Sequence, residues 1–171
     1  MRVVKLVPHD PEWADLYGAA STDIRDGLGS TALSVEHVGS TAIPGIMAKP
    51  VIDILVLVER YDPEGAYRKP LESLGFAFGH REEWHVFFEG VREGMSIQVH
   101  VVEESAQDSR VMITFRDYLR EHPDEARRYQ LLKMELAQQH SDGNAYAEAK
   151  TSYVWGIVRR VEVGRADAPG T

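Results

Sequence analysis

A glycine, two hydroxyl residues, a lysine and an aspartate gather within residues 36 to 53, which read EHVGSTAIPGIMAKPVID. Gly39, Ser40 and Thr41 follow a predicted strand, and free N–H groups at such a turn can bind a phosphate group. Lys49 stands just before a proline, which favours an extended backbone that leads into the next strand. These residues predict a phosphate-binding turn formed by Gly39, Ser40, Thr41 and Lys49.

Asp53 is the one polar residue in the run VIDILVLV, which predicts a strand buried on both faces. An ionised carboxylate in an apolar strand is unfavourable unless it is paired, hydrogen-bonded or bound to a metal. Two explanations stay open. Asp53 either accepts hydrogen bonds from the neighbouring GSTAIPG turn, or it reaches a polar cleft and binds a divalent cation or a substrate hydroxyl. Since the chain has no cysteine, any metal site must use His, Asp or Glu.

Histidines in predicted strands are the candidate partners of this carboxylate. His37 and His100 are the first two, because imidazole is a common metal ligand and general base near neutral pH. Polar and apolar residues alternate along the run from Met95 to Val102, which places His100 on the polar face. If this strand neighbours the Asp53 strand, an Asp53–His100 pair is expected. His85 is a third candidate, although its side of the sheet does not follow from the pattern.

The remaining elements predict one α/β domain with helices crowded toward the C-terminal end. Asp10 and the proline after it predict the start of a helix that ends near Gly27 and Gly29. In the C-terminal helices Leu131, Met134 and Leu136 are expected to face inward. Most of the basic residues there are expected to be solvated; they are Arg116, Arg120, Arg127, Arg128, Lys133 and Lys150. The expected strands are 3–7, 32–38, 51–58, 84–88 and 95–102, the last two forming a hairpin; the expected helices are 11–27, 63–74, 115–122, 123–140 and 145–162.

Composition limits the classes of partner. With 171 residues a single domain is expected over residues 1–163, followed by a flexible tail at 164–171, because domains cluster near roughly 100 to 150 residues. The formal net charge of -8 argues against nucleic acid and against anionic membranes, since both attract basic surfaces. The sequence has neither a signal-peptide pattern nor the roughly 20 apolar residues that cross a bilayer. A cytoplasmic protein with a small partner is therefore expected.

The stretch VEHVGSTAIPGIMAKPVIDILV resembles the signature of the GrpB-like family. The resemblance continues through DPEW, through the HVVE that begins at His100, through FRDYLREHPDEARRY, and to the lysine of EAK before the last helix, so it covers most of the chain. It implies a nucleotidyltransferase-like fold, with a mixed β-sheet, flanking helices and a helical C-terminal third. Relatives of this domain also occur fused to dephospho-CoA kinase. Within the family-like FRDYLR segment Arg116 is the candidate second phosphate contact.

Two positions depart from what the resemblance implies. Nucleotidyltransferases place a second carboxylate two residues after the first, but Leu55 occupies that position here. Two-metal phosphoryl transfer needs paired acidic ligands, which Asp53 alone does not provide. Many family members also carry a histidine where this chain has Gln98, so a two-histidine metal site on that strand is in doubt.

Three functions follow as hypotheses. The first is a metal-dependent nucleotidyl- or phosphoryl-transfer enzyme acting on a small phosphate-containing substrate, with Asp53 and His100 as catalytic residues. In this hypothesis Asp53, His100 and His37 hold a divalent metal, Mg²⁺ or Mn²⁺. The second is a non-catalytic module that binds a nucleotide or coenzyme, which Leu55 favours. The third is a metal-dependent hydrolase that uses His37, Asp53 and His100 on another substrate.

Overall fold

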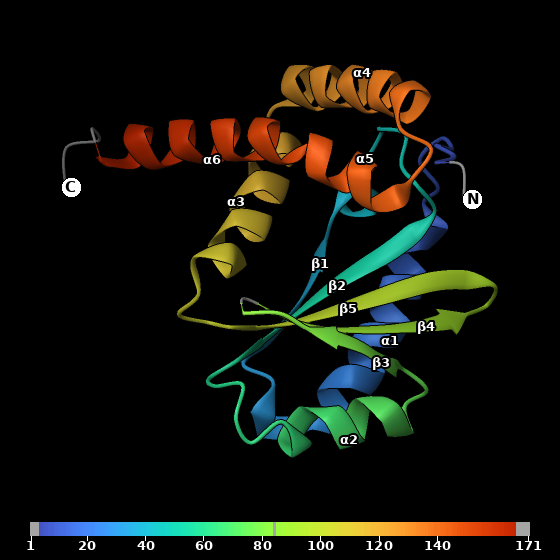
Figure 1. Cartoon of the computed structure of the whole chain (residues 1–171), viewed down its shortest axis with the longest axis vertical. Coiled ribbons are helices and arrows are strands. Elements are labelled where there is room, and N and C mark those ends of the chain that lie inside the picture. The colour runs from blue at the N-terminus through green and yellow to red at the C-terminus, as the bar shows by residue number, and fades with distance from the viewer. Residues whose placement is uncertain (1–3, 84, 167–171) are drawn as a thin grey trace.

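A five-stranded mixed sheet forms the centre of the protein, whose computed structural model describes residues 4–83 and 85–166. The strands follow the order β1-β2-β5-β4-β3 across the sheet (Figure 1). The central pair, β2 and β5, is parallel, and the other neighbouring pairs are antiparallel. The strands are β1 (Ser34–Val38), β2 (Val51–Val58), β3 (Ala77–Arg81), β4 (Val86–Arg92) and β5 (Met95–Glu103).

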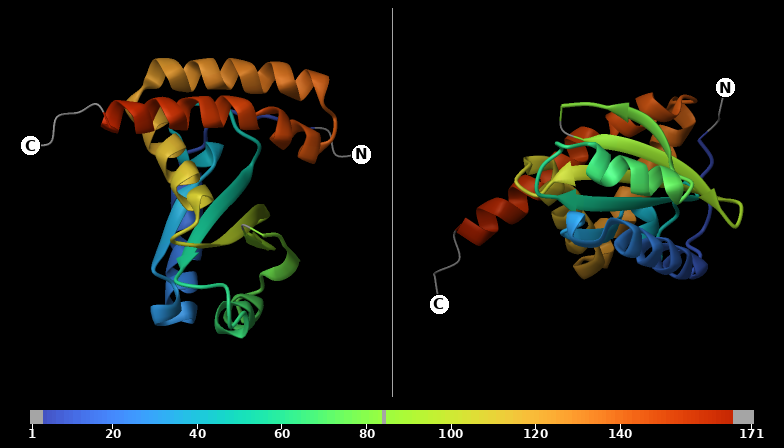
Figure 2. Two further views of the ribbon diagram at one scale, coloured as in Figure 1. Left: turned by 60° about the vertical axis from the view of Figure 1, so that its left-hand side comes forward. Right: turned by 90° about the horizontal axis from the view of Figure 1, so that it is seen from below.

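Helices cover both faces of this sheet and crowd beyond one end of it (Figures 1 and 2). The helices are α1 (Glu12–Leu28), α2 (Gly65–Ser73), α3 (Gln107–Glu121), α4 (Pro123–Gln139), α5 (Gly143–Ala149) and α6 (Thr151–Ala166). Helices α1 and α2 pack on one face, against apolar side chains that include Ile52, Ile54 and Val99. Helix α3 packs on the opposite face of the sheet, where Met112 and Ile113 pack against the apolar cluster that includes Leu55.

The apolar pattern of the sequence accounts for the two central strands. In β2 every residue except Asp53 is buried, as expected of a strand covered on both faces. In β5 the residues Ile97, Val99 and Val101 are fully buried, whereas Gln98 and His100 on the other face are partly exposed. The side chains of these two polar residues therefore share the face that carries Asp53.

Most predicted elements are confirmed, although several differ in extent or are absent. Helix α3 begins at Gln107, eight residues before the start predicted at 115, and β4 runs over Val86–Arg92 rather than 84–88, of which residue 84 lies outside the described part. The strand expected at 3–7 does not form over the described residues 4–7, where Val7 makes only an isolated bridge to Ala48. Strand β3 was not predicted at all. The expected last helix is broken at Lys150 into α5 and α6, and α6 continues to Ala166, three residues into the expected tail; residues 167–171 lie outside the described part.

Helix α4 is rotated relative to the prediction. Leu136 is buried as expected, but Leu131 is 63% exposed and Met134 is 39% exposed. The buried face carries Tyr129 and Lys133 instead, and Lys133 is only 1% exposed. Among the described residues no helix is both long enough and apolar enough to cross a membrane.

Candidate functional site

The turn after β1 brings the chain against the Asp53 carboxylate. Gly39 has φ +71°, and a Cβ atom there would lie 2.3 Å from Asp53 Oδ2. A side chain at this position would therefore meet both backbone strain and the carboxylate. Ser40–Ala42 form one turn of 3₁₀ helix, in which the Thr41 hydroxyl donates to Val51 O at 3.0 Å. None of the described turn residues donates a hydrogen bond to Asp53, so the arrangement differs from a turn held together by this carboxylate.

Two helices hold the segment between the turn and β2. From α3, Arg120 Nε donates to Ala42 O at 2.8 Å. From α4, Gln130 Oε1 accepts from the Met47 amide at 2.6 Å, and the Lys133 ammonium donates to Met47 O. Buried Lys133 therefore has a structural partner, and the prediction that it lies on a solvated helix face is wrong.

Asp53 and His100 lie beside each other on neighbouring strands. His100 Nε2 is 3.4 Å from Asp53 Oδ1, and the two side chains are 15% and 26% exposed. The other ring nitrogen, His100 Nδ1, is buried and has no hydrogen-bond partner among the described residues. Gln98 is paired with Asp53 across the β2–β5 register, so its side chain points to the same face. Leu55 shares that face too but is fully buried.

A cavity of about 420 Å³, which we call the lysine pocket, opens over this pair. The sheet and its turn form one wall with Asp53 and His100, and the C-terminal helices form the other. An added Cβ at Gly143, in the first turn of α5, would lie 3.9 Å from Lys49 Nζ, so the two walls meet near this lysine. The pocket is lined by Val38, Gly39, Ser40, Thr41, Lys49, Val51, Asp53, Gln98, His100, Val111, Met112, Phe115, Tyr129, Gly143, Asn144, Tyr146, Ala147, Lys150 and Val154.

The charge of the lysine pocket is positive, although the chain as a whole carries a formal charge of -8. Two lysines, Lys49 and Lys150, line it, and Asp53 is the one carboxylate among the lining residues. Lys150 stacks on the ring of Tyr146, with Nζ 4.1 Å from the ring centroid. Burial lowers the pKa of Lys150 to about 8, and Lys49 adds to this while Asp53 opposes it. Lys150 is therefore a poorly solvated cation that an anionic ligand would stabilise.

Two of the residues predicted for the site lie elsewhere. His37 is on the opposite face of the sheet, stacked on Tyr17 at 4.6 Å between ring centroids, with its Nε2 3.1 Å from Thr41 Oγ1. Burial lowers the pKa of His37 to about 4, so it stays neutral. Arg116 does not line the lysine pocket; it is buried and donates to Glu36, to Asp117 and to the His37 carbonyl oxygen.

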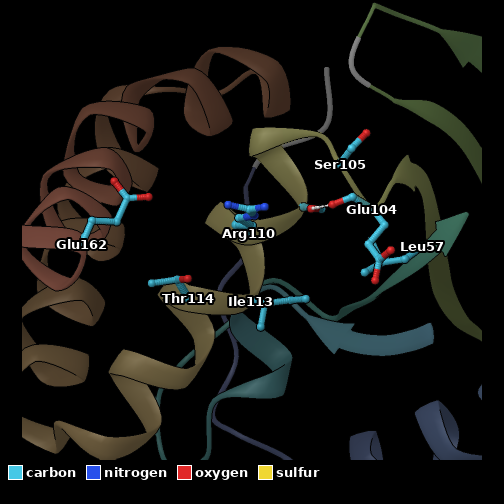
Figure 3. A pocket seen from close by; sticks show the side chains of 8 residues that line it. Leu57, Glu104, Ser105, Arg110, Ile113, Thr114 and Glu162 are labelled. Atoms are coloured by element: carbon cyan, nitrogen blue, oxygen red, sulfur yellow. Dashed lines mark hydrogen bonds between the residues drawn. The ribbon is translucent and has the colours of Figure 1, made fainter. Parts of the chain in front are cut away.

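A second cavity has a different character (Figure 3). It encloses about 620 Å³ beside Leu57, at the opposite end of β2 from Asp53. Its lining holds Arg110 together with the carboxylates Glu104 and Glu162, so its net charge is negative. The larger cavity is thus a poorer place than the lysine pocket for an anion.

Comparison with known proteins settles the family. A family model described as GrpB protein matches residues 3–160. The chain belongs to the GrpB family. A solved structure of the conserved protein GrpB from Enterococcus faecalis superposes with a TM-score of 0.79 at 28% identity, covering 91% of this chain and 96% of that one. This match and the mixed sheet with its flanking helices confirm the fold class that the sequence predicted.

Two relatives of this GrpB-family chain differ in how much of their own length it covers. A UPF0157 protein of Halalkalibacterium halodurans is 38% identical over 161 residues, which cover 92% of this chain and 82% of the relative. A dephospho-CoA kinase of Mycolicibacterium paratuberculosis is 28% identical over 186 residues, covering 92% of this chain but 46% of the relative. A domain similar to this GrpB-family chain therefore forms part of a longer protein with that name.

The helical wall of the pocket is what reasoning from the sequence missed. Tyr129, Tyr146 and Lys150 reach the pocket from helices more than 70 residues away from Asp53 in the chain. The prediction that Lys150 is solvated is wrong, because it is partly buried in the pocket. A signal was present, since Lys150 is the lysine of the EAK motif through which the GrpB resemblance extends.

Proposed function

We propose that the lysine pocket binds a small phosphate-containing ligand, such as a nucleotide, and that the protein transfers a phosphoryl or nucleotidyl group of that ligand. The main support for this proposal is that Lys49 and Lys150 both line a pocket with a single carboxylate, although the chain as a whole is acidic. Phosphate groups are recognised by such cations and by the N–H groups of turns like Gly39–Thr41. The name of the dephospho-CoA kinase relative is consistent with a ligand of this kind.

The residues of the pocket fit one divalent ion and do not fit two. Asp53 supplies one partly exposed carboxylate, and Mg²⁺ is commonly held by one or two carboxylates together with substrate phosphates and water. His100, 3.4 Å away, is the second candidate ligand, and it suits Mn²⁺ better than Mg²⁺. The position that a second carboxylate would need is Leu55, which is fully buried beneath α3. A bound ion would neutralise charge on the phosphate and orient it.

Within this proposal the chain's own residues have separate roles. Lys150 and Lys49 neutralise the phosphate oxygens from the helical wall and from the end of the turn. Asp53 binds the ion, and its contact with His100 fixes the imidazole at the edge of the pocket. His100 Nε2 could move a proton when the phosphate bond is made or broken only with the ion held by Asp53, phosphate and water, because its Nδ1 is buried and a metal-bound Nε2 has no proton to give. The structure does not bring His37 to these two residues, so the geometry gives no support to the hydrolase hypothesis.

Buried Leu55 favours a second candidate function, which is binding of the same ligand without turnover. Loss of one carboxylate removes the two-metal arrangement and leaves the lysines that hold phosphate. The two candidates share the ligand and differ only in chemistry. Release of phosphate or pyrophosphate separates them.

The test combines binding and turnover on the full chain. Isothermal titration with ATP, CTP and inorganic phosphate, with and without Mg²⁺ or Mn²⁺, is expected to show saturable binding that Lys150→Met weakens and that Lys69→Met, on the exposed surface of α2, leaves unchanged. Asp53→Asn is expected to remove the metal dependence. Wild type is expected to release phosphate or pyrophosphate, and His100→Ala to slow this by roughly 100-fold or more. Binding without any turnover would support the second candidate, and no binding would refute both.

A further inference from the structure

Three metal-ligating side chains meet at the edge of the sheet, outside the lysine pocket. His80 is in β3, Glu82 follows that strand, and His85 immediately precedes β4. One ligand atom from each lies within 4.8 Å of the other two. His80 Nε2 is 3.5 Å from Glu82 Oε1, and His85 Nδ1 is 3.7 Å from Glu82 Oε2. None of the three lines the pocket that contains Asp53.

The backbone places these side chains on one face of the sheet. The Glu82 amide donates to the His85 carbonyl oxygen at 2.9 Å, which closes the turn and brings residues three apart in the chain together. The His80 ring stacks on Phe87, its partner in the β3–β4 register, at 5.0 Å between centroids. Phe87 is in turn paired with His100 across β4 and β5. The cluster therefore lies on the same face of the sheet as Asp53 and His100, at its outer edge.

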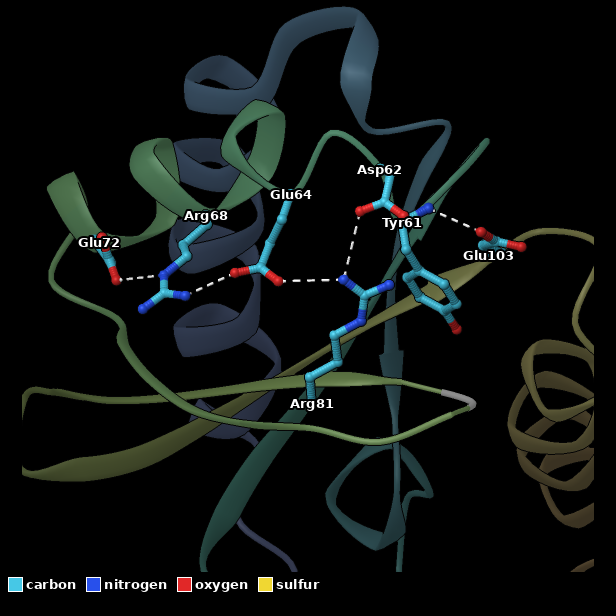
Figure 4. Close-up of polar contacts among 7 residues, drawn as sticks. All are labelled: Tyr61, Asp62, Glu64, Arg68, Glu72, Arg81 and Glu103. Carbon is cyan, nitrogen blue, oxygen red and sulfur yellow. Dashed lines mark hydrogen bonds and ion pairs between the residues drawn. The ribbon is translucent and has the colours of Figure 1, made fainter.

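A network on the other side of β3 fixes this edge strand (Figure 4). Arg81 contacts Asp62 and Glu64 at 3.5 and 3.3 Å, and Arg68 links Glu64 at the start of α2 to Glu72 in its last turn. The guanidinium of Arg81 is thus directed away from the cluster and paired with other carboxylates. Its positive charge does not compete for Glu82, so the Glu82 carboxylate contacts only the two imidazoles of the cluster among the ion pairs of the described residues.

The set of two histidines and one glutamate is typical of zinc sites that leave a fourth position open. With metal–ligand bonds of roughly 2.0 to 2.2 Å, the ligand atoms of a tetrahedral zinc lie roughly 3.3 to 3.6 Å apart. The two contacts of Glu82, at 3.5 Å through Oε1 and 3.7 Å through Oε2, are close to that spacing, and one ligand atom from each residue lies within 4.8 Å of the others, so a small inward shift would complete the set. His85 is only 6% exposed and anchors the set, whereas His80 and Glu82 are about half exposed and leave an entry path.

We propose that His80, Glu82 and His85 bind one Zn²⁺ or a similar transition-metal ion, separately from the divalent ion at Asp53. Two imidazole ligands favour zinc over Mg²⁺, whose preferred ligands are oxygens. The ion cross-links the end of β3 to the start of β4. Its binding therefore stabilises the edge of the sheet, beside the ring of His100, which is 5.7 Å from that of His85 between centroids.

The test is titration of the metal-free full chain with Zn²⁺ alone, followed by calorimetry, and with Co²⁺, followed by the visible absorption of a tetrahedral site. We expect one ion per chain and a higher midpoint of thermal unfolding with Zn²⁺ than without it. Glu82→Gln and His80→Ala are each expected to weaken zinc binding at least about tenfold, the scale known for disturbed zinc sites. Glu83→Gln is the matched control, because it removes the same charge one residue away, and its affinity is expected to be unchanged.

Asp53→Asn distinguishes the two sites. This variant is expected to keep its zinc affinity, because Asp53 does not belong to the cluster. Zinc binding that Asp53→Asn abolishes and His80→Ala leaves intact would overturn the inference, and so would the absence of saturable zinc binding to wild type. Equal losses in Glu82→Gln and Glu83→Gln would also overturn it, since they would indicate attraction by surface charge alone.

Discussion

Lys150 gives the lysine pocket a pH dependence that can be measured. Burial lowers its pKa in the ligand-free protein to about 8, so it is mostly protonated at pH 7.5 and mostly neutral at pH 9.5. Only the protonated form attracts a phosphate. We therefore expect the affinity for ATP to be highest below about pH 8 and to fall as the pH rises above it.

The magnitude follows from one titrating group. A single proton required for binding changes the dissociation constant by at most about tenfold per pH unit, until the pKa of Lys150 in the complex is reached. A hydrogen bond to a charged group contributes about 1.5 to 3 kcal/mol, so Lys150→Met should bind ATP roughly 10- to 100-fold more weakly at pH 7.5. The same variant should show almost no change in affinity between pH 7.5 and pH 9.5.

The assay is isothermal titration at several pH values, each in two buffers with different heats of ionisation. Wild type should take up protons on binding near pH 8.5, and Lys150→Met should not. Lys150→Arg is the matched control, because an arginine stays charged and should bind at pH 9.5 nearly as well as at pH 7.5. A pH dependence that is the same in wild type and Lys150→Arg would refute the role given to Lys150.

Three further predictions concern the framework of the site. Gly39→Ala should lower the free energy of unfolding by more than Gly75→Ala, because both have positive φ but only the Cβ at Gly39 meets Asp53; chemical denaturation measures the difference, and equal losses would show that the carboxylate moves aside freely. The folded-state pKa of Lys133 is lowered to about 7 by burial, so the unfolded chain binds the extra proton and the free energy of unfolding should rise between pH 7 and pH 9, on the order of 1 kcal/mol per unit; Lys133→Met should reduce that slope, and an unchanged slope would contradict the burial. Arg116→Met should destabilise the protein by about 1 to 3 kcal/mol through the partners left unpaired, with ATP affinity unchanged in calorimetry; a large loss of affinity would return this arginine to the phosphate site.

The strands of the site could be predicted because the burial of each strand face determines which positions are apolar. Asp53 stands out as the one polar residue among eight in β2, and the alternation of β5 placed His100 on the polar face before the pairing of the strands was known. Strand β3 could not be found in this way. Four of its five residues are exposed, and the register shifts between Phe78 and His80, so no alternation is left in the sequence AFGHR.

The helical wall could not be predicted for a different reason. Apolar character alone predicts that Leu131 and Met134 of α4 face the core. The structure buries Lys133 instead, because the carbonyl oxygen of Met47 accepts a hydrogen bond from its ammonium group. Such a partner comes from a distant part of the chain, and nothing in the spacing of residues along α4 indicates it.

The break between α5 and α6 at Lys150 places the residues proposed for chemistry and those proposed for ligand selection on different elements. Asp53 and His100 belong to rigid central strands, whereas Gly143, Tyr146 and Lys150 belong to a short helix and its junction with the next one. Under the proposed function, exchanging the pocket-lining residues Gly143, Asn144 and Ala147 is expected to alter ligand selection while leaving the sheet residues in place. Ligand preference can therefore diverge through the pocket-lining positions of α5 that lie outside the core, whereas Tyr146 is constrained because it packs with Val4 and Leu136.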